Sequence, residues 1–102
     1  MAQKNAADSE AVEKSERAKK IKRDQYIADM SFLLGDPRGR RVIWELLERG
    51  GVFRISFTGN SETFFNEGKR QIALSLLEDV MESRPDAYLQ MSKEAKEGEK
   101  NG

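Results

Sequence analysis

Apolar residues recur at helical spacing in four stretches of the chain. Within residues 24–35 they fall three and four positions apart, which is the period of a helix with one apolar face. The same period returns in residues 37–49 and from about 61 to 83, and a shorter stretch covers residues 85–96. Pro85 separates the last two, because proline cannot continue the hydrogen-bond ladder of a helix. The pattern predicts an all-α protein, a small bundle of three or four helices.

The second predicted helix carries sequence signals at both of its ends. Asp36 can act as the N-cap by accepting hydrogen bonds from free backbone N–H groups, and Pro37 fits the first helical position. Gly50 and Gly51 follow the helix, where glycine is favoured because it adopts left-handed backbone angles readily. We therefore expect sharp boundaries near residues 37 and 49.

Polar, charged segments flank the predicted bundle. Between residues 8 and 23 the only large aliphatic side chains are Val12 and Ile21, so this stretch favours helix but has no face wide enough to bury. We expect either a solvated, partly frayed arm or a helix that becomes ordered on a partner. The interpretation is an arm over residues 1–23, a helical domain over 24–92 and a disordered tail over 93–102.

The loop between the second and third helices is unusually aromatic. VFRISFTGNSETFFNEG, residues 52–68, holds four of the five phenylalanines. Val52 to Phe57 alternates like a strand, so it either packs over the helices as an extended loop or pairs with another chain. Its rings either close the open end of the bundle or stay exposed until a neighbouring subunit covers them. The candidate partner-binding residues are Phe53, Phe57, Thr58, Asn60, Phe64 and Phe65.

Composition limits both the core and the chemistry. Only 37% of the 102 residues are hydrophobic and 35% are charged, so a domain of this size gains little net stability and a partner chain is expected. The chain has no cysteine and no histidine, which excludes disulfides, disfavours zinc and removes the usual catalytic triads. We expect no enzyme activity, no cofactor or metal and no small-molecule substrate. No apolar run is long enough for a membrane span, so no membrane partner is expected.

Charge is segregated although the formal net charge is zero. Residues 1–23 hold seven basic and four acidic residues, whereas residues 71–91 hold one basic and four acidic. Acidic residues of the third helix and the turn after it, such as Asp79, are expected on a solvated or partner-facing surface. Two groups of basic residues, one at the end of the arm and one at the start of the second predicted helix, are candidates for binding phosphate or an acidic partner. Alternatively, Arg41 pairs with Glu45 and its neighbours are solvated. These candidates are Arg38, Arg40, Arg41, Lys19, Lys20, Lys22 and Arg23.

Two glycines inside predicted helices suggest close packing. Gly39 and Gly68 each weaken a helix, and such a glycine often allows another element to approach closely. Trp44 is the bulky candidate, and we hypothesise that it packs near Gly68 in the core. The residues assigned structural roles are Trp44, Gly51, Gly59, Gly68, Asp36 and Pro37.

The middle 60 or so residues resemble a known family. The segments WELLE from Trp44, GVFR from Gly51, SFTGNS from Ser56, FFNEGKR from Phe64 and YLQM from Tyr88 are similar to those of small, largely uncharacterised proteins of tailed bacteriophages, mostly short-tailed ones. The resemblance implies a virion or morphogenesis component rather than an enzyme, with no catalytic residues to carry over.

These observations together favour a non-enzymatic phage protein that acts through protein contacts at the head, portal or tail, or in an assembly step. Its expected partners are other phage structural proteins and copies of itself, first in the host cytoplasm and then in the virion. Two alternatives stay open: a packaging factor that binds nucleic acid through the basic arm and the arginine cluster, and an early phage protein that binds a host enzyme.

Overall fold

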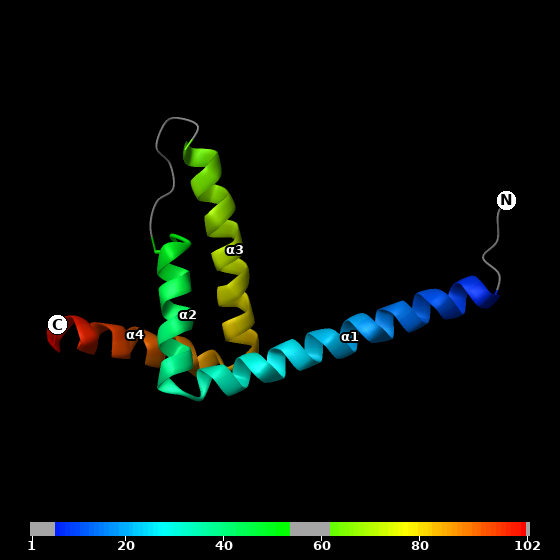
Figure 1. Ribbon diagram of the computed structural model, residues 1–102, viewed down its shortest axis with the longest axis horizontal. Helices are drawn as coiled ribbons and strands as arrows, with labels where there is room; N and C mark the ends of the chain where they lie inside the picture. Colours follow the sequence, from blue (N-terminus) through cyan, green and yellow to red (C-terminus); the bar gives the residue numbers. More distant parts are fainter. Residues whose placement is uncertain (1–5, 54–61, 102) are drawn as a thin grey trace.

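The computed structural model describes residues 6–53 and 62–101 of the chain, and all regular structure within these ranges is helical. The helices are α1 (Ala6–Leu34), α2 (Pro37–Arg49), α3 (Glu62–Ser83) and α4 (Pro85–Asn101). Helices α2 and α3 run antiparallel as a hairpin, and α1 and α4 leave its base in opposite directions (Figure 1). The predicted all-α class is confirmed.

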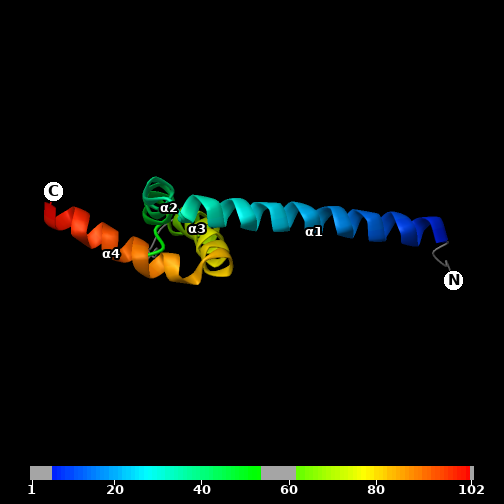
Figure 2. The same cartoon turned by 90° about the horizontal axis from the view of Figure 1, so that it is seen from below.

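The molecule is wide and thin. Its principal extents are 65 × 40 × 15 Å and its radius of gyration is 19.1 Å, whereas a compact chain of about 100 residues has a radius of gyration of about 13 Å. Seen along the hairpin, α1 and α4 pass on opposite sides of the α2–α3 pair (Figure 2). The thickness therefore corresponds to about two layers of packed helices.

The core lies where the base of the hairpin meets α1 and α4, and we call this place the junction. Its buried side chains come from all four helices and are Met30, Leu34, Ile43, Leu47, Val80, Ala87 and Met91. Trp44, Leu76, Leu77 and Tyr88 pack against them from partly buried positions. The helical periods of the sequence thus converge on one small core rather than along the full length of a bundle.

Both ends of α2 follow the sequence signals. The side chain of Asp36 accepts a hydrogen bond from the backbone N–H of Arg38 at 2.8 Å, and Pro37 is the first helical residue. At the other end Gly51 has φ of 78°, in the left-handed region that suits glycine. The predicted boundaries of α2 are confirmed.

Close approach occurs at Gly39 but not at Gly68. A Cβ atom at Gly39 would overlap the backbone carbonyl of Leu33, so α2 can cross the end of α1 only because residue 39 is glycine. A Cβ atom at Gly68 would meet nothing within 4 Å. The hypothesis that Trp44 packs against Gly68 is therefore wrong.

The C-terminal segment is also not as predicted. Helix α4 continues through residues 93–101, where a disordered tail was expected. Two features explain its extension: the segment is rich in glutamate and lysine, which favour helix, and Glu94 is bound by Arg40 of α2. At the other terminus α1 runs without a break from the polar arm into the junction.

Candidate functional site

The three arginines at the start of α2 have three different environments. Arg38 is exposed and turns back to the cap, where its Nε and Nη2 donate to Asp36 at 3.1 and 2.8 Å. These hydrogen bonds, with the backbone bond from Arg38, hold the pKa of Asp36 well below its usual range. Arg38 is thus engaged in capping rather than held ready for a phosphate.

Arg40 is the most buried of the three and joins three helices. Its Nε and Nη2 donate to the two carboxylate oxygens of Glu94 on α4 at 2.7 and 3.1 Å, and its Nη1 donates to the carbonyl of Leu34 at 2.9 Å. The hydrogen bonds from Arg40 lower the pKa of Glu94, and the charges of Arg40 and Arg41 act in the same direction. A guanidinium with these partners holds the junction together and has little capacity left for a ligand.

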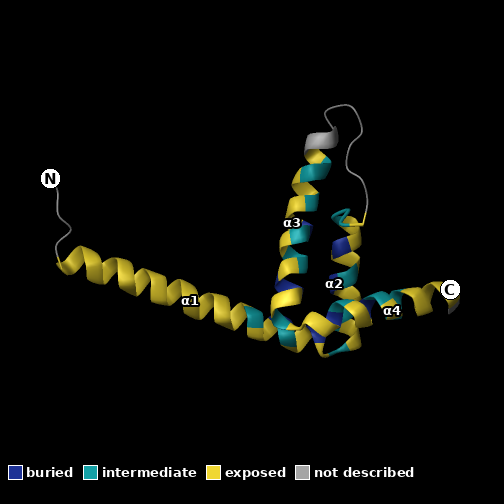
Figure 3. Cartoon of the chain, turned by 180° about the vertical axis from the view of Figure 1, so that it is seen from behind, coloured by how far each residue is buried: buried dark blue, intermediate teal, exposed yellow. Residues whose placement is uncertain are grey.

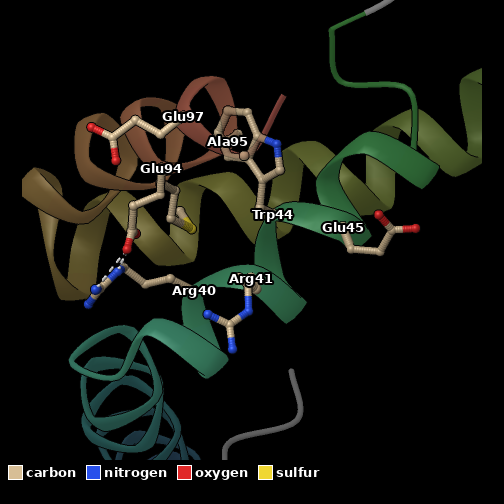
Figure 4. A pocket seen from close by; sticks show the side chains of 9 residues that line it. Arg40, Arg41, Trp44, Glu45, Glu94, Ala95 and Glu97 are labelled. Atoms are coloured by element: carbon tan, nitrogen blue, oxygen red, sulfur yellow. Dashed lines mark hydrogen bonds and ion pairs between the residues drawn. The ribbon is translucent and has the colours of Figure 1, made fainter. Parts of the chain in front are cut away.

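Arg41 is exposed, and no ion pair joins it to another described residue. The expected pair of Arg41 with Glu45 is absent from this part of the structure, and Glu45 instead accepts from Arg49 at 3.0 Å. Arg41 borders a groove of about 570 Å³ between α2 and α4. Of the two neighbouring arginines only Arg40 reaches Glu94 (Figure 4).

Apolar and charged side chains alternate around this groove. The lining residues are Arg40, Arg41, Trp44, Glu45, Met91, Glu94, Ala95, Glu97 and Gly98. An indole wall beside a free guanidinium can hold the planar acidic or amide side chain of another protein. The groove can therefore take a polar segment of a partner.

Trp44 connects the groove to the aromatic segment. Its ring stacks on Phe53 with centroids 5.0 Å apart and lies 6.1 Å from the ring of Tyr88, while its Nε1 donates to Glu48 at 2.7 Å. Phe53, predicted to bind a partner, is half-exposed in this stack. Trp44, which was assigned a structural role, thus packs against the core at the α2–α4 side rather than near Gly68.

The remaining aromatic candidates divide into described and undescribed residues. Phe65 is exposed on α3, with the ammonium of Lys69 5.1 Å from its ring centroid. Phe57, Thr58, Gly59 and Asn60 lie outside the described residues, as does the side chain of Phe64.

The basic candidates of α1 are largely paired within the chain. The Nζ of Lys19 lies 3.4 Å from Oε1 of Glu16, and the Nζ of Lys20 lies 2.7 Å from Oδ2 of Asp24. Both ion pairs lie on exposed helix surface. Arg23 reaches α3. Lys22 lines a hollow of about 370 Å³ beside Arg23 and forms no ion pair with a described residue. The arm before Arg23 is exposed throughout residues 6–22 (Figure 3).

An ionic cluster fixes α1 across α3. The Nη2 of Arg23 donates to Asp79 at 2.8 Å and to Glu82 at 2.6 Å, and the hydroxyl of Tyr26 donates to Asp79 at 2.7 Å. Burial and the bond to Asp79 raise the pKa of Tyr26. Asp79 is 9% exposed, so the expectation of a solvated position was wrong for this residue. No sequence signal joins positions 23 and 79, because the pair spans 56 residues.

Two searches for other site types gave no candidates among the described residues. No group of three or more His, Cys, Asp or Glu side chains there is placed to hold a metal ion. No helix in the same residues has the length and apolar character required to cross a membrane.

Comparison with known proteins gave one match. The family model described as Bbp19-like phage protein matches residues 30–93. No curated protein and no solved structure matched the chain. The matched range begins in the last turns of α1 and ends in α4, so it contains the whole junction and leaves out the arm.

Proposed function

The chain belongs to the family of Bbp19-like phage proteins, and from this premise we propose that it is a non-enzymatic virion or morphogenesis protein. It acts through protein–protein contacts at the head, portal or tail, in several copies. It is made in the host cytoplasm and is then incorporated into the particle.

The shape of the molecule is the observation that carries this proposal. A chain 65 Å long and 15 Å thick, whose main cluster of buried side chains lies at the junction, leaves much helix surface free. Proteins that function alone usually bury more of their apolar surface in one core. A thin frame with a projecting arm suits a component that is completed by neighbours in an assembly.

Mass spectrometry of purified phage particles tests the proposal. We expect the protein in particles or assembly intermediates at a copy number above one. A variant lacking residues 1–16 should keep the junction fold and show reduced incorporation, because the arm is available for contacts. Gln90→Ala, which alters an exposed side chain of α4 outside the groove, is the control for the arm. Absence of the protein from both particles and intermediates would contradict the proposal.

A second function, a nucleic-acid-associated packaging factor, is favoured by one observation. Residues 17–23 contain five basic residues and no acidic one, on an arm whose side chains are exposed as far as residue 22. The pairing of Arg23 with Asp79 and Glu82 reduces the charge available to phosphate. This function predicts DNA binding that weakens steeply with salt and is lost in an Arg17→Glu, Lys22→Glu variant. No binding at ~50 mM salt would exclude this role.

A further inference from the structure

One flank of α3 continues beyond the part that α1 covers. Phe65, Ile72 and Asp79 are spaced seven residues apart, so they lie along one side of the helix, two turns from each other. Asp79 marks this side as the one that faces α1, since Arg23 and Tyr26 bind it. Farther along α3 the same flank is open: Ile72 is 76% exposed and Phe65 is 69% exposed.

A matching flank of α2 faces the same side of the hairpin. Gly39, Val42 and Leu46 are spaced three and four residues apart, and Gly39 lies against Leu33 of α1. Gly50, one turn beyond Leu46, packs against Ala73 of α3. Val42 and Leu46 therefore run from the α1 contact toward the free end of the hairpin, and they are 60% and 43% exposed.

We define the hairpin face as Val42, Leu46, Phe65 and Ile72, and we propose that two copies of this chain pair through it about a two-fold axis. The proposal names the partner for the protein contacts suggested above and rests on that proposed function. Helix α1 covers only the base of this side of the hairpin, and the face begins where α1 leaves it (Figure 1).

The area of the face suits a symmetric pair. Four large side chains that are half to three-quarters exposed leave roughly 400 Å² of apolar surface. Pairing would cover this amount on each copy, and the polar rim would raise the total toward the ~1,200–2,000 Å² of a specific interface. Other exposed large hydrophobic residues are distributed over several elements, such as Phe32 on α1, Met81 on α3 and Leu89 on α4.

Charges beside the face do not oppose such a pair. Glu82 is bound by Arg23 and Arg49 is bound by Glu45 within the same chain. Lys69, beside Phe65, is a cation that borders the face. A second copy presents the same apolar face, and a two-fold axis brings the two faces together. The occupant is therefore a second copy.

The experiment measures molar mass by light scattering over a concentration series of the full chain. We expect a dimer for the native sequence and a monomer for Ile72→Glu and for Val42→Glu, since each places a charge within the apolar face. Leu89→Glu is the matched control, because Leu89 is 72% exposed and belongs to α4, which passes on the other side of the hairpin from α1 (Figure 2). Circular dichroism of every variant should retain the native helix content, which separates dissociation from unfolding.

A native monomer at all concentrations, or a dimer lost in Leu89→Glu but kept in Ile72→Glu, would overturn the proposal. A dimer that is absent from phage particles would contradict the proposed function and leave this inference intact.

Discussion

The arm of α1, residues 6–22, and the junction are both helical, but different forces maintain them. In the junction Leu34, Leu47 and Val80 are fully buried, and Arg40 ties three helices together. Residues 6–22 are all exposed, and ion pairs such as Lys19 with Glu16 join residues one turn apart. Such exposed pairs contribute only about 0.2–0.5 kcal/mol each.

This difference shows how a polar arm can be helical without a core of its own. Starting a helix is the costly step, whereas adding residues to an existing helix is nearly neutral for good helix formers. The root of α1, residues 23–34, is fixed by packing and by the ionic cluster, so the arm only has to extend it. We expect the arm to be helical because it is attached to the junction.

The largest effect should come from truncating a side chain in the centre of the junction. Leu47→Ala removes a side chain with no exposed surface and should lower the free energy of unfolding by about 2–5 kcal/mol. For so small a core this is a large part of the total stability. Val12→Ala in the arm should change it by less than about 0.5 kcal/mol. Urea unfolding followed by circular dichroism measures both, and equal midpoints would remove the distinction between arm and junction.

Two neighbouring arginines sharpen the comparison within α2. Arg40→Ala leaves Glu94 without its bidentate partner in a partly buried position and should cost about 1–3 kcal/mol of unfolding free energy. Arg41→Ala removes an exposed guanidinium and should stay within about 0.5 kcal/mol of the native value. The check is chemical denaturation of both variants. A loss at Arg41 as large as that at Arg40 would contradict the assigned roles.

Two glycines should respond in opposite directions. Gly39→Ala forces α1 and α2 apart at the Leu33 carbonyl and should destabilise by about 1–3 kcal/mol. Gly68→Ala meets open space and should stabilise α3 by about 0.5–1 kcal/mol. Thermal unfolding at a concentration where the chain is monomeric measures the direction of the change in melting temperature for both variants. A lower melting temperature for Gly68→Ala would mean that this position is occupied.

Acid should weaken the junction through Glu94. Its pKa is lowered from the usual 4.5 by Arg40, so the folded state binds the proton less readily than the unfolded state. The stabilisation is complete above about pH 5 and is lost as the pH falls through the lowered pKa. Glu94→Gln should flatten this part of the stability profile, and Arg40→Ala should do the same. Unfolding midpoints between pH 3 and 6 test it; an unchanged acid slope in Glu94→Gln would assign the effect to other carboxylates.

The smallest effect is expected from removing the arm. Deleting residues 1–16 should leave the unfolding midpoint of the junction unchanged, because every residue from 6 to 16 is exposed. The helical circular dichroism signal per molecule should fall in proportion to the number of helical residues that are deleted. An isolated peptide of residues 1–22 should be mostly unfolded in water. A large fall in the midpoint after deletion would show that the arm stabilises the junction.

Local signals predicted the helices well. The cap at Asp36, the proline at 37 and the glycines at 50 and 51 gave the bounds of α2, because these residues act on the backbone next to them. The end of α3 at Ser83 and the start of α4 at Pro85 followed from one proline. The extent of α4 was missed, since its last turns depend partly on a contact between Glu94 and distant Arg40.

The candidate site was less predictable than the helices. Arg38, Arg40 and Arg41 look alike in sequence, yet one pairs with the N-cap Asp36, one joins three helices and one faces a groove. Asp79 resembles its exposed acidic neighbours, and only the crossing of α1 over α3 buries it. Pairs that span more than 50 residues leave no periodic trace in a single sequence, so charge alone did not distinguish structural from available residues.

The ionic cluster at Arg23 turns the continuous α1 into a lever. From residue 23 to residue 6 a helix extends about 25 Å at 1.5 Å per residue, with no further support from the described chain. A tilt of about 10° at the cluster would therefore move the tip by roughly 4 Å. The helix would tilt about the ion pairs of Arg23 with Asp79 and Glu82, which are partly solvated. Salt or charge substitutions at these residues should therefore change the direction of the arm more than the free energy of unfolding.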